Sequence, residues 1–326
     1  MSSPDQPSPS ADSTSRERGP RQSQAVLVTG CSGGFGFRAA RSLGRAGHRV
    51  IAGLRAPEGS NRPQATALTG TAVAEGWEVL CLPLDVDDTA SVEGAVEEAT
   101  RWAGPLDTVV NTAAYSVMGP LEACTPEQLL SMLNTNVVGA LRLFRAVLPQ
   151  MRGAGAGRII QLTSGLGRAA VPFMGIFAAG AWAQECFAEV LAYEAAAFGV
   201  DVAILEPAGY SHAEGSPPDG LTGERRETRR GGPPLKMVGD TDRLPAYERQ
   251  LVSFAEHLRR NDTPEGDPEE VAEAVVRAVE ALNVPLRTPV GTAAKALIDL
   301  RSEKRGADYE QAITELTGLA RFRHPE

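Results

Sequence analysis

Three glycines, Gly30, Gly34 and Gly36, stand between a short apolar run and a stretch with helical periodicity. Residues without a Cβ let the backbone approach a bulky anion, and the first turn of a helix presents N–H groups to negative charge. Ser32 and Phe35 lie in the same segment, Thr-Gly-Cys-Ser-Gly-Gly-Phe-Gly, and are expected to take part in it. The spacing predicts a loop that binds the pyrophosphate of a dinucleotide.

Further motifs follow the later apolar runs. They are Asp85-Val86, Asn111-Thr112-Ala113-Ala114, Asn136, Ser164 and Pro207. Together with the glycine loop, they resemble the short-chain dehydrogenase/reductase family, and within it the steroid- and retinol-dehydrogenase branch, over roughly residues 25–210. The resemblance implies a dinucleotide cofactor held by these strand-end segments.

The resemblance assigns a role to each motif. Asp85 and Val86 match the pair that holds adenine. Asn111 and Ala113 stand where the family has Asn-Asn-Ala-Gly, beside the adenosine. Pro207 begins the stretch that corresponds to the family's Pro-Gly-xxx-Thr motif.

Arg55 follows the second apolar run, where the ribose 2′ position of a dinucleotide would lie. An Asp at this point would accept a hydrogen bond from a 2′-hydroxyl group, whereas an Arg suits a 2′-phosphate through a bidentate pair. Arg55 therefore favours NADP(H) over NAD(H) as the cofactor.

The family's proton-transfer pair is missing from this chain. Its signature is a Ser, a Tyr 13 residues later and a Lys four residues beyond that. Counting from Ser164, these positions hold Phe177 and Ala181. None of the five tyrosines has a Lys four residues on, so no shift of alignment restores the pair. Loss of a positioned general acid costs ~10² to 10⁴ in rate.

Several groups could replace the lost acid. Ser164 can hydrogen-bond a carbonyl group, and Asn136, which matches the family's catalytic asparagine, could do so through an ordered water. Tyr115 lies just beyond the fourth apolar run, and His212 falls where the Thr of the Pro-Gly-xxx-Thr motif would be. Histidine can give or take a proton near neutral pH. Water, or an acidic hydroxyl group of the substrate, is an alternative source.

The elements that would position these residues alternate between short apolar runs and amphipathic stretches. Strands are predicted at 25–28, 50–53, 79–82, 108–110, 158–162, 202–205 and 286–290, and helices at 37–46, 91–102, 126–151, 173–198 and 267–282. This alternation predicts an α/β fold with a doubly wound parallel sheet, Rossmann-type, in a single domain.

The domain is expected to span residues 25–300. Residues 1–24 are rich in Ser and Pro and predict a disordered tail, and 301–326 predict a helical C-terminal tail. Residues 211–249 are dense in Gly, Pro and charge, which predicts either a substrate lid at the carboxyl edge of the sheet or a solvated insertion.

Composition excludes several classes of function. A net charge of -9 argues against a nucleic-acid partner. No stretch approaches the ~18 consecutive apolar residues of a membrane helix. The four cysteines are far apart and no two of the four histidines are spaced as paired ligands, so no metal site is expected. A cytoplasmic protein with reduced thiols is the expectation.

Three functions remain open. The first is an NADPH-dependent reductase of a hydrophobic or polycyclic ketone with a non-standard proton donor. The second is a redox-neutral cyclase or isomerase on the same scaffold, and the third is a non-catalytic NADP(H)-binding sensor. In the family the helices at 126–151 and 173–198 form a dimer face, so the resemblance implies a homodimer.

Overall fold

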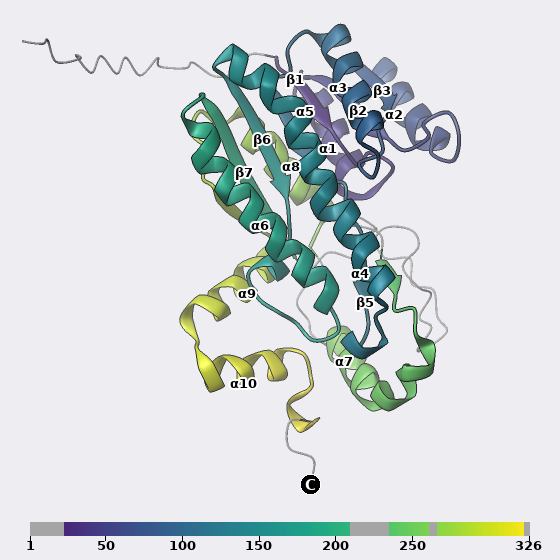
Figure 1. The fold of residues 1–326 in the computed structure, drawn as a ribbon, viewed down its shortest axis with the longest axis vertical. Helices are drawn as coiled ribbons and strands as arrows, with labels where there is room; N and C mark the ends of the chain where they lie inside the picture. The colour runs from purple at the N-terminus through teal and green to yellow at the C-terminus, as the bar shows by residue number, and fades with distance from the viewer. Residues whose placement is uncertain (1–22, 209–234, 261–265, 323–326) are drawn as a thin grey trace, which may run out of the picture.

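The computed structural model describes residues 23–208, 235–260 and 266–322. Its centre is a seven-stranded sheet in the order β3-β2-β1-β4-β6-β7-β9, in which every neighbouring pair is parallel (Figure 1). The strands are β1 (Ala25–Val28), β2 (Arg49–Leu54), β3 (Val79–Pro83), β4 (Thr108–Asn111), β6 (Gly157–Leu162), β7 (Val200–Pro207) and β9 (Arg287–Val290). This order is the doubly wound arrangement that the alternation predicts, and that prediction is confirmed.

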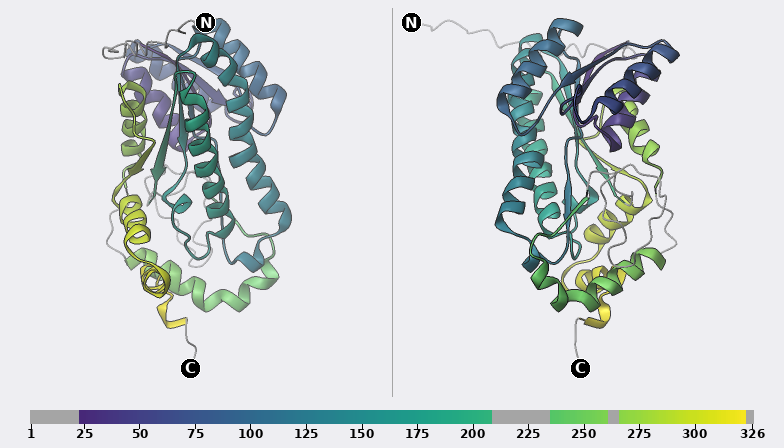
Figure 2. Two further views of the ribbon diagram at one scale, coloured as in Figure 1. Left: turned by 60° about the vertical axis from the view of Figure 1, so that its left-hand side comes forward. Right: turned by 90° about the vertical axis from the view of Figure 1, so that its right-hand side faces the viewer.

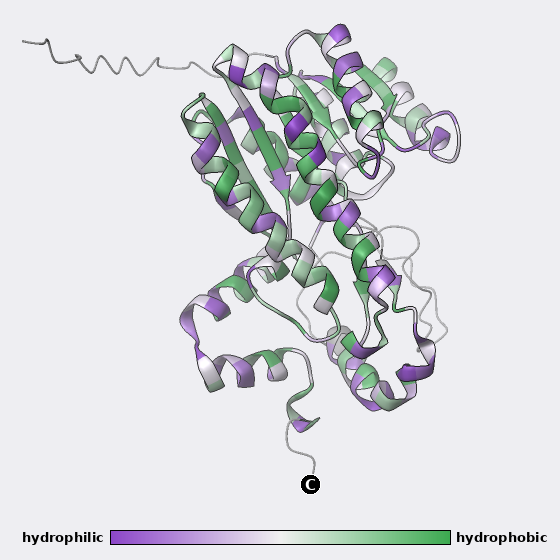
Figure 3. Cartoon of the chain, viewed as in Figure 1, coloured by the Kyte–Doolittle hydropathy of each residue, from purple (hydrophilic) through white to green (hydrophobic). Residues whose placement is uncertain are grey.

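Helices cover both faces of the sheet, as the right-hand view of Figure 2 shows. One face packs against α3 (Thr89–Ala103), α5 (Gly139–Ala154) and α6 (Gly175–Ala196) in a single buried cluster. The other face packs against α1 (Gly34–Arg45), α2 (Arg62–Glu75) and α8 (Pro268–Glu280). The strands are apolar along most of their length because both of their faces are buried (Figure 3).

A long helical stretch runs from α4 (Pro126–Leu133) into α5 through a π-helical turn, η2 (Asn134–Val138). Thr125 and Gln128 form a capping box at the start of α4, each side chain accepting a hydrogen bond from the other residue's backbone N–H. The predicted helix at 126–151 thus corresponds to three consecutive segments. π-helical turns often occur at functional sites, and this one carries Asn136.

Beyond the main sheet, β5 (Ser116–Met118) pairs in parallel with β8 (Leu235–Met237). β8 leads through η4 (Thr241–Tyr247) into α7 (Glu248–Arg260). The chain ends in α9 (Thr292–Glu303), α10 (Gly306–Leu316) and η5 (Ala320–Phe322). In Figure 1, α7, α9 and α10 lie at the end of the molecule toward which the strands point.

The structure corrects four details of the sequence interpretation. Helix α2 lies at 62–75, where no element was predicted. Residues 235–249, expected to be irregular, contain β8, η4 and the start of α7. Gln24, assigned to the disordered tail, is buried and its side chain donates a hydrogen bond to the Val279 carbonyl. The domain boundary at 300 falls inside α9.

Among the described helices, none has the length and apolar character that crossing a bilayer requires. Residues 1–22 of the tail predicted at 1–24, and residues 211–234 of the lid expected at 211–249, lie outside the described residues.

Candidate functional site

Apart from Asn136, which lies in η2, the described residues predicted for the site lie at or just after the carboxyl ends of six strands, β1, β2, β3, β4, β6 and β7, and therefore along one edge of the sheet. The direction in which the chain adds strands to the sheet reverses between β1 and β4. From β1 the chain continues outward through β2 and β3 on one side, and from β4 it continues through β6 and β7 on the other. Ligands of open α/β sheets bind in the crevice at such a reversal. The glycine loop after β1 and Asn111 at the end of β4 flank it.

The glycine loop is held tightly to the strand-end segment after β4. The Thr29 hydroxyl donates to Asn111 Oδ1 at 2.6 Å, and the Thr112 hydroxyl donates to the Thr29 carbonyl oxygen at 2.7 Å. A Cβ at Gly36 would lie 2.6 Å from the Gly30 carbonyl oxygen and 2.5 Å from Thr112 Oγ1, so only glycine fits there. The loop is therefore a fixed turn against which α1 begins.

The start of α1 is the candidate position for the pyrophosphate. Its N-cap residue, Gly33, contributes no side-chain hydrogen bond to the first turn. Among the described residues outside its immediate chain neighbours, no atom lies within 4 Å of a Cβ placed on Gly33, so there is space beside the loop at this point. Ser32 and Gly34 are half-buried beside this space, and Phe35 is buried under it. Backbone N–H groups in the first turn of a helix are suited to bind the negative charge of a pyrophosphate.

The residues predicted to contact the adenosine differ in how exposed they are to solvent. Arg55 is exposed just after β2, and its carbonyl oxygen accepts a hydrogen bond from the Asn61 side chain at 2.5 Å. Asp85 is half-buried, and its Oδ1 accepts from the Asp87 N–H at 3.1 Å. Val86 is buried, and Ala113 is half-buried beside the glycine loop, its N–H donating to Thr29 Oγ1 at 3.2 Å.

Asn136 is completely buried and uses its whole side chain on one neighbour. Its Nδ2 donates to the Tyr115 carbonyl oxygen at 2.9 Å, and its Oδ1 accepts from the Tyr115 N–H at 3.1 Å. This pair of bonds fixes the backbone that leaves β4. The Asn136 carbonyl oxygen accepts a third hydrogen bond, from Gln184 Nε2 on α6, at 2.7 Å.

Ser164 follows β6 and caps the short helix η3 (Gly165–Gly167). Its side chain is 7% exposed, and its Oγ accepts from the Leu166 N–H at 3.2 Å. A hydroxyl group that accepts in this way can still donate its own hydrogen. The Ser164 hydroxyl group therefore keeps the capacity to donate a hydrogen bond.

Two buried glutamates lie next to the Ser164 turn. Glu185 on α6 accepts from the Thr163 hydroxyl at 2.5 Å and from Arg287 Nε at 2.9 Å. Glu206, at the end of β7, pairs with Arg168 at 3.1 Å. Burial raises the pKa of Glu206, the nearby charge of Glu185 adds to the rise, and the Arg168 charge opposes it. These ion pairs hold the segment after Ser164 against β7, β9 and α6.

Phe177 and Ala181 lie one turn apart on α6, and both are buried. Phe177 is 6% exposed and presents only a hydrocarbon ring. Ala181 is 1% exposed, and its carbonyl oxygen would lie 3.1 Å from a Cβ at Gly167. Neither side chain can give or take a proton.

Tyr115 directs its hydroxyl group toward α4. The hydroxyl donates to Ser131 Oγ at 2.9 Å, and Lys236 Nζ lies 4.0 Å from the centre of the ring. Tyr115, Ser131 and Lys236 line a cavity of about 270 Å³ together with Val117, Glu127 and Gln128. Within the described chain, no hydrogen bond joins the Tyr115 and Ser164 hydroxyl groups. His212 lies outside the described residues, and Pro207 is buried at the end of β7.

Comparison with known proteins shows the family to which the chain belongs. The family model of short chain dehydrogenases matches residues 24–214. The chain belongs to the short-chain dehydrogenase family. It is 30% identical over 276 residues to the 3-ketodihydrosphingosine reductase of Bacteroides thetaiotaomicron, an alignment that covers 85% of this chain and 91% of the relative.

Solved short-chain dehydrogenases share the fold. A short-chain dehydrogenase from Streptomyces avermitilis superposes with a TM-score of 0.71 at 27% identity and covers 90% of this chain and 96% of its own. An alcohol dehydrogenase from Thermococcus sibiricus, solved in complex with 5-hydroxy-NADP, gives a TM-score of 0.62 at 21% identity, covering 83% and 97%. At that identity, the second likeness shows the fold alone.

Three residues of this short-chain dehydrogenase were not predicted as part of the site: Gln184, Glu185 and Glu206. Each is a polar or charged residue inside a mainly apolar helix or strand, and that contrast was the available signal. Polar groups are rarely buried without partners, so such positions predict hydrogen bonds across the fold. The partners themselves, Asn136, Thr163 and Arg168, could only be found from the structure.

Proposed function

We propose that this chain binds NADP(H) and reduces a ketone on a hydrophobic or polycyclic substrate, using a proton donor other than the family's tyrosine. The proposal rests on a combination of features. The glycine loop has space beside Gly33 for a pyrophosphate, and the Ser164 hydroxyl group can donate a hydrogen bond. The α6 positions of the family's Tyr and Lys hold Phe177 and Ala181. The relative named as a reductase of 3-ketodihydrosphingosine supports a ketone as substrate.

The glycine loop would hold the pyrophosphate at the start of α1, and Asp85, Val86, Asn111 and Ala113 would border the adenosine. Arg55, exposed at the end of β2, supports NADP(H) because a guanidinium group matches a 2′-phosphate in a bidentate pair. When bound, the reduced cofactor supplies the hydride for the ketone carbon. The solved relative that contains 5-hydroxy-NADP agrees with this choice of cofactor.

The chain's own residues would orient and polarise the substrate. The Ser164 hydroxyl donates a hydrogen bond to the carbonyl oxygen as negative charge develops on it. Asn136 holds the Tyr115 backbone at the entrance of the same crevice. Apolar side chains from the segment after Ser164 and from the start of α6 would exclude water from the ketone: Leu166, Val171, Phe173, Met174 and Phe177.

The proton must come from a group other than Phe177. Tyr115 and His212 are the candidates on the chain, and water or an acidic hydroxyl group of the substrate is the alternative. The Tyr115 hydroxyl donates to Ser131, so its use would require that bond to open. Replacing Tyr115 by Phe, or His212 by Gln, is expected to lower turnover by ~10² or more if that residue is the acid. The exposed Tyr193 replaced by Phe is the matched control.

Calorimetric titration tests the cofactor. NADPH is expected to bind more tightly than NADH, and Arg55→Ala should remove most of that preference. Arg62→Ala, a change of an exposed arginine on α2, should leave it intact. If neither NADPH nor NADH bound, the proposed function would be wrong.

Incubation with NADPH and a panel of aromatic and long-chain ketones tests the reaction, followed at the near-ultraviolet band of the reduced cofactor. Loss of that band together with formation of the alcohol supports reduction. Conversion of a substrate without loss of the band would identify a redox-neutral enzyme instead. Nucleotide binding without any turnover would identify a sensor.

We also propose a homodimer formed through α5 and α6. Exposed apolar side chains occur along both helices: Leu141, Trp182, Phe187, Val190 and Tyr193. Contiguous apolar side chains on a surface mark interaction sites.

A further inference from the structure

The loop between η3 and α6 contains a bulky residue in an unusual backbone conformation. Phe173 has φ of 66°, in the left-handed region that residues with a Cβ rarely adopt. Such conformations persist only when the surrounding structure holds them, and they concentrate at functional sites. Two contacts hold this one: the Phe173 carbonyl oxygen accepts from the Gly119 N–H at 2.8 Å, and its ring meets the ring of Phe254 edge-on at 5.2 Å.

Phe254 belongs to α7, which is fixed in turn by residues 306–322. These residues are called the tail from here on, and they form part of the helical tail predicted at 301–326. The Ser253 hydroxyl donates to the Gly318 carbonyl oxygen at 2.7 Å. Gly318 has φ of 69°, and a Cβ on it would lie 2.6 Å from the Cβ of His257. The tail backbone therefore approaches α7 so closely that only glycine fits between them.

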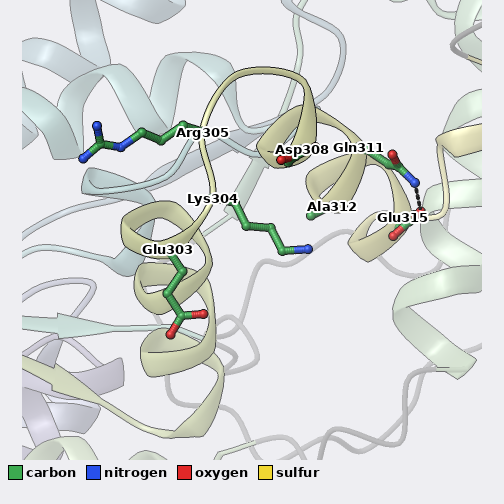
Figure 4. A pocket seen from close by; sticks show the side chains of 7 residues that line it. All are labelled: Glu303, Lys304, Arg305, Asp308, Gln311, Ala312 and Glu315. Atoms are coloured by element: carbon green, nitrogen blue, oxygen red, sulfur yellow. Dashed lines mark hydrogen bonds between the residues drawn. The ribbon is translucent and has the colours of Figure 1, made fainter.

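The tail also reaches the loop after Ser164 from another direction. Ala169 in that loop packs with Leu297 of α9 and Ile313 of α10 in one buried cluster, and Leu166 and Val171 pack against it. The outer side of the tail is different. A cavity of about 430 Å³ between α9 and α10 is lined by charged side chains such as Lys304, Arg305 and Asp308 (Figure 4). The tail thus has charged side chains around this cavity, and apolar side chains where it packs against the loop.

We propose that the tail selects the substrate: by fixing α7 through Gly318, and Phe173 through Phe254, it sets the position of the apolar wall between Ser164 and α6. This inference rests on the proposed function, in which that wall borders the ketone. Ser253, Gly318 and Phe254 are positioning residues, and Phe173 is the residue whose placement determines how large a substrate fits. The views in Figure 2 agree with this arrangement, since α7 and the tail lie together at one end of the molecule.

Hydrogen exchange of the full-length protein without ligand tests the physical link. Gly318→Ala should speed exchange at 165–174 and 248–257 by on the order of tenfold, while residues 25–36 stay unchanged. Gly306→Ala is the matched control, because Gly306 also has a positive φ, of 54°, but a Cβ there has no contact within 4 Å among the described residues. Ser253→Ala keeps the backbone unaltered and is the second variant should Gly318→Ala not fold. Equal effects of both glycine variants, or unchanged exchange at 165–174, would overturn the proposal.

Substrate selection is then measured with one small and one bulky ketone. Gly318→Ala should change the ratio of kcat/KM between them by on the order of tenfold, with the NADPH affinity unchanged. An unchanged ratio overturns the selecting role. If no ketone is reduced even by the parent protein, the proposed function fails, and the exchange experiment still decides whether the tail controls Phe173.

Discussion

Gln184 on α6 donates a hydrogen bond of 2.7 Å to the carbonyl oxygen of Asn136, and both residues are buried. The bond crosses from α6 to the π-helical turn η2, where the irregular backbone exposes a carbonyl group toward its neighbour. Gln184 lies three residues beyond Ala181, on the helix that also carries Phe177. The π-helical turn is therefore held in place by an amide side chain.

Gln184→Met should destabilise the protein by about 1–3 kcal/mol. The substitution keeps the volume similar but leaves the Asn136 carbonyl oxygen buried without a donor, and the desolvation of that group is then uncompensated. Urea denaturation of the parent and variant measures the difference. Gln311→Met is the control, because Gln311 bonds Glu315 on the surface of α10 and should change stability by less than about 0.5 kcal/mol. If both substitutions lowered the free energy of unfolding equally, the hydrogen bond to Asn136 would contribute no more to stability than a surface hydrogen bond.

Phe177→Tyr combined with Ala181→Lys should raise ketone reduction by ~10² or more if the crevice otherwise remains that of a reductase. The phenol supplies the missing acid, and the ammonium charge favours its ionised form. The Lys side chain must enter a position that is 1% exposed, so the single Phe177→Tyr variant is made alongside it. Rates of NADPH oxidation with one ketone, and NADPH affinities, are compared. Loss of a native activity without any gain would show that the pocket serves another reaction.

The sheet was predictable because each strand is a local apolar run and each strand-end motif follows it directly. The glycine loop, Asp85 and Asn111 were found in this way, and the structure puts them at one edge. Helix α2 was missed because it buries only Leu68 and Ala72, so it lacks an apolar stripe. β8 was missed because its residues pair through backbone groups with β5, which composition does not reveal.

Hydrogen bonds and ion pairs between residues far apart in the sequence could not be predicted from the sequence. Gln184 and Asn136 are 48 residues apart, and Arg168 and Glu206 are 38 apart. Gln24 shows the same limit: it follows a Ser- and Pro-rich stretch, yet its side chain reaches the Val279 carbonyl, 255 residues on. The residue types predict that such polar groups need partners, and only the packing of α6, α8 and β7 determines which.

Val190→Glu should convert the proposed homodimer to a monomer. Val190 is 45% exposed on α6 among other exposed apolar side chains, and a carboxylate there would be buried without a partner in a dimer face. Sedimentation velocity at micromolar concentration measures the assembly. Val73→Glu is the matched control, because Val73 is 80% exposed on α2, on the opposite face of the sheet. Sedimentation of the parent protein as a monomer would contradict the dimer itself.

Acid should destabilise this protein partly through His48. Its side chain is buried, its Nδ1 accepts a hydrogen bond from the Gln24 N–H at 3.3 Å, and its Nε2 lies 3.4 Å from the Glu280 carboxylate. Burial lowers the pKa of His48, and the charge of Glu280 only partly opposes this. The unfolded chain, with a histidine pKa of about 6.5, therefore takes up a proton at a higher pH than the folded chain does.

As the pH falls through about 6.5, proton uptake by the unfolded state lowers the free energy of unfolding, until the folded His48 is protonated as well. His48→Gln should reduce the loss of stability between pH 7.5 and pH 5, because its side-chain oxygen can still accept from the Gln24 N–H. Glu280→Gln should act in the opposite direction, since removing the carboxylate lowers the pKa of His48 further. Urea denaturation at the two pH values measures each variant against the parent. If the parent and His48→Gln lose the same stability, His48 does not carry this acid sensitivity.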